Sequence, residues 1–326
     1  MVDAARGCLA GLAVGDALGQ PTEGWTRQAI ADKWGYLEGF VGDIKVSDDT
    51  EYTLFSAQAF LRYGLNASSQ DFAAAWLEHI VPHPGPFKGA GFSEMAAIDN
   101  LRRGLLPPQS GRHYHSWSDG LAMRVAPCGI LAAGNPILAA HLAEIDGSVS
   151  HDGEGIYAGQ AVAAAQAVAM TAADLNQADL DQIIEAALSV IPENSWTARN
   201  INLALELVSG RELREVLEPL YDVLAVTYYP WTDLGPEAVG LAFGLLAAGR
   251  GDFRNTVLAA VNLGRDTDTV AAIVGSILGA QQGMSAIPTE WLEVLRPATG
   301  ICLTCVRGVD LLETADALVT LRNGSP

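Results

Sequence analysis

Residues 7–19 read Gly-Cys-Leu-Ala-Gly-Leu-Ala-Val-Gly-Asp-Ala-Leu-Gly, and this stretch sets the kind of fold that the chain can adopt. Apolar side chains recur at helical spacing over 8–17, and alanine has the highest helix propensity. Small alanine and glycine side chains also let two helix axes approach each other closely. We therefore expect a closely packed helix that ends at Asp16 in a glycine-rich turn closed by Gly19. An acid at a helix C-terminus opposes the helix dipole, which favours a specific partner for Asp16.

The rest of the chain repeats this pattern. Apolar residues at helical spacing, with alanine frequent among them, predict helices over 52–63, 72–80, 121–133, 156–170, 183–191, 201–208, 239–248 and 270–281. Breaks coincide with glycine and proline clusters such as 82–86 and 134–136. No stretch alternates polar and apolar residues for long enough to predict a sheet, and no linker divides the chain. The prediction is an all-α fold, built as a single compact domain over 1–326.

Composition narrows the classes of partner. The chain has 326 residues, of which 49% are hydrophobic and 17% charged, so it can bury a large core and is not expected to be disordered. Its 38 acidic and 19 basic side chains give a formal charge of -19, which excludes attraction to a nucleic-acid backbone as the main binding mode. A small phosphorylated ligand held by local donors stays compatible with this charge.

The sequence also favours a cytoplasmic protein that does not interact with membranes. It has four cysteines, fewer than a secreted disulfide scaffold of this size would carry, and its first residues lack the positive charge of a signal peptide. Residues 155–173 are uncharged, but they are rich in Ala, Gly and Gln, which suits an interior helix better than a membrane span. Cys302-Leu303-Thr304-Cys305 is a weak redox or metal motif because no second pair accompanies it.

Two acidic clusters each precede an apolar helix. One is Ser47-Asp48-Asp49-Thr50, and the other is Gly264-Arg265-Asp266-Thr267-Asp268-Thr269. Either cluster alone fits a helix N-cap. Brought together, four carboxylates would repel one another or hold a proton, whereas a divalent cation would turn them into ligands. The all-oxygen set suits magnesium, manganese or calcium rather than zinc. The sequence does not fix whether the two clusters meet in space.

Two further polar turns precede helices. Residues 118–124, Ser-Asp-Gly-Leu-Ala-Met-Arg, present backbone donors that suit a phosphate or a ribose. Residues 150–157, Ser-His-Asp-Gly-Glu-Gly-Ile-Tyr, contain His151, which is either a ligand contact or a satisfied turn residue. Taken alone, His151 is better explained by the turn.

In their order along the chain, these motifs resemble the ADP-ribosylglycohydrolase family, which includes the dinitrogenase reductase-activating glycohydrolase. Residues 7–19 resemble the family's opening helix and GDAxG turn, and Glu23 stands where a glutamate is common. Ser47-Asp48-Asp49-Thr50 resembles its T-D-D-T motif, and 120–129 its G-x-x-M-R-x-x-P-x-G segment. Ser150-His151 resembles the central T-H, and Asp266-Thr267-Asp268-Thr269 resembles the D-T-D-T helix.

The resemblance implies an all-helical fold of the ADP-ribosylglycohydrolase type with a binuclear magnesium or manganese centre. The implied reaction is hydrolysis at the anomeric carbon of a ribose, within ADP-ribosylated protein or an ADP-ribose derivative. Asp48 or Glu23 is expected to act as the base, and Asp16 to hold the ligand turns. The implied metal ligands are Ser47, Asp48, Asp49, Asp266, Asp268 and Thr269. The expected substrate contacts are Glu23, Ser118, Asp119, Gly120, Met123, His151, Tyr157 and Arg265.

Three residues depart from the family pattern. Ser47 replaces a threonine, and its hydroxyl can still be a ligand. Arg265 stands where a second glycine is common, so it could pair with a carboxylate, block a groove or grip an anionic substrate. Asp119 replaces an asparagine and adds a negative charge near the expected diphosphate. Arg265 and Asp119 favour an alternative substrate, a small N-riboside or nucleotide-derived metabolite. A non-catalytic ADP-ribose-binding protein is disfavoured because all four aspartates are present.

Overall fold

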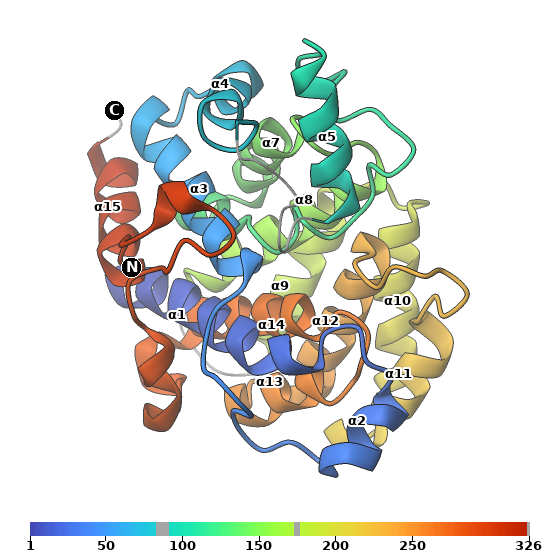
Figure 1. Cartoon of the computed structure of the whole chain (residues 1–326). Coiled ribbons are helices and arrows are strands. Elements are labelled where there is room, and N and C mark those ends of the chain that lie inside the picture. Colours follow the sequence, from blue (N-terminus) through green and yellow to red (C-terminus); the bar gives the residue numbers. More distant parts are fainter. Residues whose placement is uncertain (83–90, 173–176, 325–326) are drawn as a thin grey trace.

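Two helices, α1 (Val2–Gly19) and α14 (Thr267–Gln282), lie side by side at the centre of the molecule (Figure 1). The computed structural model describes residues 1–82, 91–172 and 177–324. The two helices run antiparallel, so the C-terminal end of α1 lies beside the N-terminal end of α14. This pairing brings the first and last thirds of the chain together.

Glycines spaced four residues apart on α1 form the contact with α14. A methyl group on Gly11 would come within 2.1 Å of the carbonyl oxygen of Gly275, and one on Gly275 within 2.1 Å of the carbonyl oxygen of Gly11. A methyl group on Gly19 would lie 2.4 Å from the Cα of Asp268. Such distances leave no room for a side chain, so the two axes are as close as helix backbones permit.

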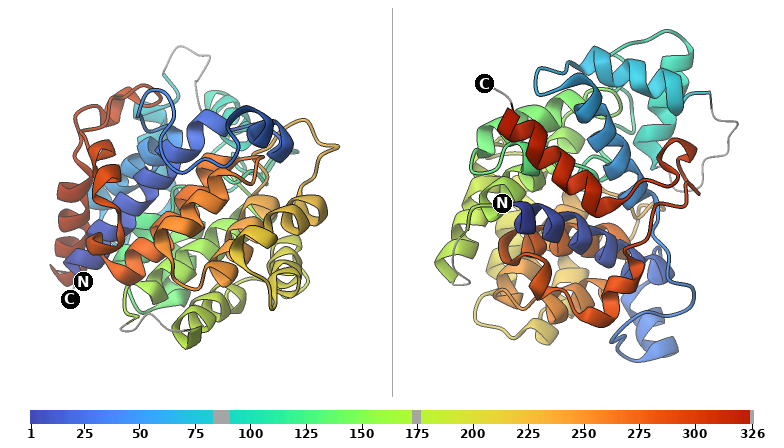
Figure 2. Two further views of the ribbon diagram at one scale, coloured as in Figure 1. Left: turned by 90° about the horizontal axis from the view of Figure 1, so that it is seen from below. Right: turned by 90° about the vertical axis from the view of Figure 1, so that its left-hand side faces the viewer.

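The described part of the chain is an all-helical single domain without a strand; Ser118 and Leu234 form one isolated bridge. Its other α-helices are α2 (Arg27–Trp34), α3 (Asp48–Tyr63), α4 (Ser69–His79), α5 (Phe92–Arg102), α6 (Ala126–Leu131), α7 (Pro136–Gly147), α8 (Glu154–Ala169), α9 (Gln177–Ser189), α10 (Trp196–Val208), α11 (Leu217–Leu224), α12 (Gly235–Gly249), α13 (Phe253–Val261) and α15 (Leu311–Gly324). They surround the α1–α14 pair (Figures 1 and 2).

Two local predictions need correction. The helix predicted over 121–133 begins only at Ala126, because a proline at position 127 is tolerated in the first turn but not in a helix interior. Gly19 does not close α1 with a left-handed turn; its φ is -80°, and its small size serves the contact with α14. The break expected at 134–136 is confirmed, since α6 ends at Leu131 and α7 begins at Pro136 with Asn135 as its N-cap. The proline-rich stretch at 82–86 lies, apart from Pro82, outside the described residues.

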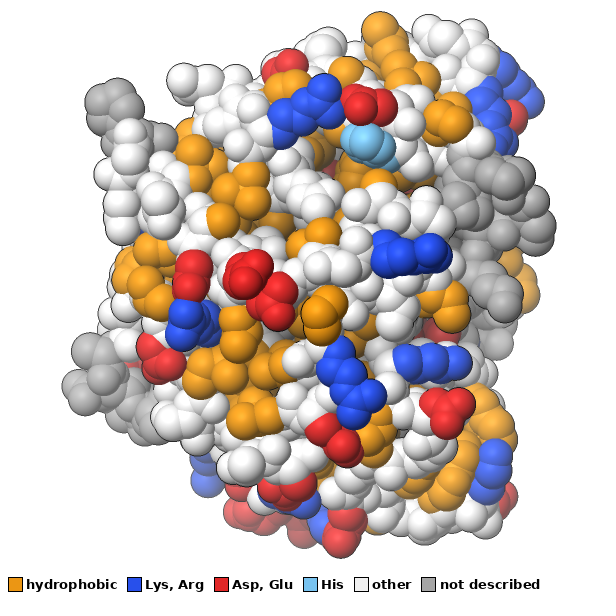
Figure 3. Space-filling view, turned by 60° about the vertical axis from the view of Figure 1, so that its left-hand side comes forward, with side chains coloured by type: hydrophobic (Ala, Val, Ile, Leu, Met, Phe, Trp, Pro, Cys, Tyr) orange, Lys and Arg blue, Asp and Glu red, His pale blue; other side chains and the backbone are white. Residues whose placement is uncertain are grey.

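The ends of the described chain are joined by an ion pair. Arg6 of α1 donates from Nε to Asp316 of α15 over 2.8 Å. On the face shown in Figure 3, acidic, basic and hydrophobic side chains are interspersed, so the net negative charge is not gathered there into one block. No helix in the described residues combines the length and the hydropathy needed to cross a bilayer.

Candidate functional site

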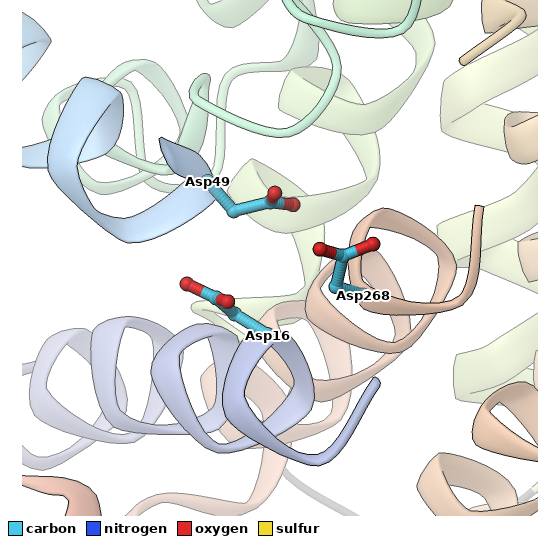
Figure 4. Close-up of side chains that lie close together, drawn as sticks. All are labelled: Asp16, Asp49 and Asp268. Atoms are coloured by element: carbon cyan, nitrogen blue, oxygen red, sulfur yellow. The ribbon is translucent and has the colours of Figure 1, made fainter. Parts of the chain in front are cut away.

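The two acidic clusters of the sequence meet in space, at the junction of three helix ends. Asp16 comes from the C-terminal end of α1, Asp49 from the first turn of α3 and Asp268 from the first turn of α14. One carboxylate oxygen of each lies within 4.8 Å of those of the other two, and the three side chains lie close together where these helix ends meet (Figure 4). We call these three residues the aspartate cluster. The close α1–α14 contact is what brings its members within this distance.

Asp16 holds the start of α3 in place. Its carboxylate accepts hydrogen bonds from the backbone nitrogen of Ser47 at 2.9 and 3.0 Å and from that of Thr50 at 3.1 Å. The Thr50 hydroxyl donates a further, short bond of 2.5 Å. These donors are the partner that the sequence predicts for an acid at a helix C-terminus. Asp16 therefore orients the Ser47–Thr50 turn.

Hydroxyl groups link the remaining carboxylates. Ser47 is the N-cap of α3, and its hydroxyl lies 3.3 Å from Oδ2 of Asp49. The Thr269 hydroxyl donates to Oδ1 of Asp49 over 3.0 Å. Asp266 is the N-cap residue of α14, but its side chain makes no capping hydrogen bond. Capping thus explains Ser47 and leaves the aspartates of the second motif without a structural role of that kind.

The aspartate cluster has no cation to balance it among the described ion pairs. Burial, together with repulsion by neighbouring carboxylates, raises the pKa of Asp49 and of Asp268 well above the ordinary range, and burial raises that of Asp16 to about 6. Oδ1 of Asp268 is buried without a hydrogen-bond partner. Buried acceptors of this kind are costly unless something fills them. The all-oxygen donor set fits a hard divalent cation.

A pocket of about 590 Å³ opens beside the cluster. It contains the predicted residues Glu23, Asp48, Asp49, Asp119, Gly120, Met123, Asp266, Asp268 and Thr269. The sequence did not single out its other lining residues, which are Gly91, Phe92, Met95, His115, Trp231, Thr232 and Asp233. We call this the main pocket. Seven of its described lining residues are acidic, and none is lysine or arginine.

Two acids at the edge of the main pocket have strongly shifted pKa values. Withdrawal of its carboxyl from water and the neighbouring Asp266 raise the pKa of Glu23, at the exposed mouth, to about 7. Burial and Asp266 raise the pKa of Asp119 well above its ordinary value, and Oδ2 of Asp119 is buried without a partner. Acidic groups thus extend beyond the aspartate cluster, and each one disfavours the ionised form of its neighbours.

Ser118 and His151, both expected to contact substrate, do not line the main pocket. They lie in a buried network behind its wall, where Nε2 of His151 is 3.0 Å from the Ser118 hydroxyl. Burial and the nearby Arg124 lower the pKa of His151 well below its ordinary value, so the ring is neutral at pH 7. These contacts fit the interpretation of His151 as a hydrogen-bonded turn residue rather than a ligand contact. Tyr157 is half-buried and is also absent from the lining.

Arg124 is the centre of that network. Its guanidinium is 2.8 Å from Oε1 of Glu94 and 3.1 Å from Oδ1 of Asp146, and it donates to the carbonyl oxygen of Gly120. All three charged side chains are buried. We call Arg124, Glu94 and Asp146 the arginine cluster. It fixes the turn that carries Asp119 and Gly120 into the pocket.

Arg265 pairs with a carboxylate, which was one of its three expected possibilities. Its Nε donates to Oε1 of Glu237 over 2.6 Å, and its terminal nitrogen donates to the carbonyl oxygens of Val226 and Trp231. The residue has a φ of 69°, a conformation that glycine adopts without strain. Arg265 thus holds the segment before α12 in place through these hydrogen bonds. Its side chain does not line the main pocket.

Comparisons with known proteins place these features in a family. The ADP-ribosylglycohydrolase profile matches residues 1–326. The chain belongs to the ADP-ribosylglycohydrolase family. It is 33% identical over 302 residues to an uncharacterized protein of Archaeoglobus fulgidus, covering 89% of this chain and 91% of that one.

A more distant relative and a solved structure are also similar to this chain over most of its length. The chain is 23% identical over 305 residues to the ADP-ribosyl-dinitrogen reductase glycohydrolase of Rhodospirillum rubrum, covering 90% of each protein. Its fold matches that of an ADP-ribosylglycohydrolase-related protein complex, with a TM-score of 0.69, 24% identity and 98% coverage of both chains. This structural match confirms the all-helical fold that the motif order predicts.

The pocket residues that the sequence analysis missed come from segments without a family motif. Phe92 and Trp231 stack with ring centroids 5.1 Å apart, and His115 meets the Trp231 ring at 4.8 Å. Asp233 accepts a bond from the backbone nitrogen of Phe92, and burial raises its pKa to about 7. The sequence signal nearest to Trp231 and Asp233 is Pro230, which marks a break between helices but not a binding residue.

Proposed function

We propose that this protein is a metal-dependent hydrolase that cleaves the glycosidic bond at the anomeric carbon of a ribose in an ADP-ribosyl substrate. The observation that carries the proposal is the aspartate cluster, whose buried carboxylates face one another beside a pocket of about 590 Å³. Pockets of several hundred Å³ hold ligands of nucleotide size. Family membership supports the reaction class, and the name of the Rhodospirillum rubrum relative supports an ADP-ribosyl group.

Two magnesium or manganese ions are proposed as cofactors, with Ser47, Asp48, Asp49, Asp266, Asp268 and Thr269 as their ligands. The unpartnered Oδ1 of Asp268 supports a cation at this place. When bound, such ions supply positive charge that can hold ribose hydroxyls and lower the pKa of a water molecule. Asp16 would set the position of the α3 ligands through its bonds to Ser47 and Thr50.

Hydrolysis also needs a base that takes a proton from the attacking water. Glu23 and Asp48 are the proposed candidates, since both line the main pocket. Their roles can be separated by measuring metal affinity together with turnover. If Glu23 is the base, Glu23→Gln lowers kcat and leaves manganese affinity unchanged. If Asp48 is mainly a ligand, Asp48→Asn weakens both.

A second substrate class, a small N-riboside, is favoured by the charge of the main pocket. Two divalent cations would balance four of its seven acidic residues, and no described lining residue is a lysine or arginine that could receive a diphosphate. Asp119, which stands where the family pattern has asparagine, adds to this charge. A neutral riboside would meet less repulsion than ADP-ribose.

The test is hydrolysis of ADP-ribosyl-arginine and ADP-ribosyl-serine peptides with magnesium or manganese, followed as free ADP-ribose. We expect the wild type to release ADP-ribose, EDTA to abolish this release, and the Asp268→Asn variant to release none. A panel of small ribosides is assayed in parallel, followed as free ribose. Release from the ribosides alone would move the proposal to the second substrate class, and no release from either panel by the metal-loaded protein would contradict it.

A further inference from the structure

Arg265 connects two parts of the main pocket that are distant in the sequence. It directly precedes Asp266, which lines the pocket. The Arg265 side chain is 8% exposed, and it pairs with Glu237 of α12, whose side chain is 1% exposed. Its Nε donates to Oε1 of Glu237 over 2.6 Å, and a terminal nitrogen donates to Oε2 over 3.1 Å. This two-pronged contact requires a guanidinium and fixes the orientation of the side chain.

The same ion pair holds both ends of the segment 226–231. At its start, the backbone nitrogen of Val226 donates to Oε2 of Glu237 over 2.7 Å, and the carbonyl oxygen of Val226 accepts from Arg265 over 3.3 Å. At its end, the carbonyl oxygen of Trp231 accepts from the same nitrogen of Arg265 over 3.2 Å. One buried ion pair therefore fixes the segment at both of its ends.

The segment ends in a group of three rings that line the main pocket, Phe92, His115 and Trp231, which we call the aromatic wall. Phe92 and Trp231 stack with an angle of 29° between their planes, and His115 meets Trp231 edge-on. Because both other rings pack on Trp231, a shift of the Trp231 backbone would open or displace the whole wall.

The backbone of Arg265 makes a separate set of contacts. Its nitrogen donates to the carbonyl oxygen of Trp25 over 2.8 Å, and its carbonyl oxygen accepts from the nitrogen of Gly24 over 2.9 Å. These bonds fix the turn after Glu23 and do not depend on the side chain. The φ of 69° is strained for arginine and unstrained for glycine. The side chain must therefore contribute something that the backbone contacts do not supply.

We propose that Arg265 is a positioning residue that fixes the aromatic wall relative to the aspartate cluster and thereby sets the affinity for the part of the substrate beyond the ribose. The second half of this inference rests on the proposed function. With the ribose at the aspartate cluster, a group that extends along the main pocket meets the aromatic wall, whose rings offer flat apolar contact. A small riboside carries no such group, so Arg265 favours the larger ADP-ribosyl substrates.

Arg265→Gly tests the proposal, because glycine keeps the backbone contacts and removes only the side chain. The protein is labelled with fluorotryptophan, and its fluorine NMR signals are assigned with Trp231→Phe and Trp291→Phe. In Arg265→Gly the Trp231 signal is expected to shift or broaden. The Trp291 signal is expected to stay unchanged, since that ring lies under Arg254 instead, at 4.8 Å.

Arg254→Ala is the matched control. Arg254 also joins a glutamate to a backbone carbonyl, because it pairs with Glu290 and donates to the carbonyl oxygen of Glu38 over 3.3 Å. It does not line the main pocket. This variant should move the Trp291 signal and leave that of Trp231 unchanged. The reversed pattern would show that each change is local rather than a general loosening of the fold.

Binding measurements separate positioning from a purely structural effect. In Arg265→Gly, the Kd for ADP-ribose and the KM for an ADP-ribosyl peptide should rise about tenfold, as expected of a misplaced pocket wall. The kcat and the Kd for manganese should stay within about twofold, because the aspartates keep their backbone support. The variant leaves the Glu237 carboxylate buried without its cation, so the double variant with Glu237→Gln is measured too. It should regain stability without regaining affinity for ADP-ribose.

The two proposals fail in different ways. An unchanged Trp231 signal in Arg265→Gly would overturn this inference, whatever the substrate is. Equal loss of manganese and ADP-ribose affinity, or recovery of ADP-ribose affinity in the double variant, would make Arg265 a purely structural residue and overturn it as well. If the metal-loaded wild type neither binds nor releases ADP-ribose, the proposed function fails, while a displaced Trp231 signal still supports the positioning of the aromatic wall.

Discussion

The molecule contains two buried groups of acids, and they differ in what balances them. In the arginine cluster, Glu94 and Asp146 lie at 2.8 and 3.1 Å from the guanidinium of Arg124. In the aspartate cluster, Asp16, Asp49 and Asp268 lie close together, and none of the described ion pairs involves them. A buried charge must be paired or coordinate a metal. The first group is therefore balanced within the fold, whereas the second would be balanced only by bound protons or by a cation.

The largest effect on stability is expected from removing the cation of the arginine cluster. Arg124→Met leaves Glu94 and Asp146 buried without a counter-charge, which costs about 3–5 kcal/mol of unfolding free energy. Urea denaturation of the variant and the wild type measures this loss. Adding Glu94→Gln to the variant should recover part of the stability, because it removes one of the uncompensated charges. A loss below about 1 kcal/mol would mean that the pairing matters less than its burial implies.

The next effect is the response of the aspartate cluster to metal. Manganese or magnesium at about one hundred times its Kd should raise the unfolding free energy by about 2.7 kcal/mol, because the ion binds only the folded state. The control is Asp49→Asn, which should abolish most of this increase. A full increase in the variant would place the binding ion elsewhere in the molecule.

A smaller effect is expected from pH in the absence of metal. Burial raises the pKa of Asp16 to about 6, and burial together with the neighbouring carboxylates raises the pKa values of Asp49 and Asp268 well above their ordinary range. The folded state therefore binds these protons more tightly than the unfolded state does, and the stability that they contribute is lost as pH rises through these values. The melting temperature in EDTA should fall as the pH rises from about 4, the ordinary range of an aspartate, to about 6. A melting temperature that stays constant or rises over this range would contradict the repulsion among the buried carboxylates.

The smallest change in stability is expected from Asp268→Asn in the metal-free protein. Removing one of several repelling carboxylates should leave the unfolding free energy within about 1 kcal/mol of the wild type, or raise it. Hydrolysis should be lost at the same time. The two measurements distinguish a metal ligand from a structural residue, because substitution of a structural residue would lower both the stability and the activity. Retained activity would contradict the metal centre.

The acidic residues of the site can be predicted from the sequence, but their proximity in space cannot. Asp48, Asp49, Asp266 and Asp268 stand out because carboxylates and hydroxyls alternate before apolar helices. Their proximity depends on the glycines of α1 against those of α14, a contact between distant parts of the chain. Spacing within one helix carries no information on its partner. The order of the family motifs supplied what periodicity could not.

The missed and misplaced residues have physical reasons. Phe92, Trp231 and Asp233 enter the main pocket from segments whose local patterns resemble ordinary turns. His151 follows a serine in a motif-like turn, yet its ring is satisfied by Ser118 and Ser150 behind the wall. A sequence shows which side chains can bind a ligand, but not on which side of a wall they lie.

The close contact between α1 and α14 also bears on the order in which the chain can fold during synthesis. The glycine face of α1 emerges first, and the helix that covers it emerges roughly 250 residues later, about 12–50 s at 5–20 residues per second. Contacts of such long range also slow folding, because a long loop must close before they form. During that interval the α1 face has no native partner. The aspartate cluster is thus among the last features to assemble, so repulsion between its carboxylates does not oppose the earlier steps of folding.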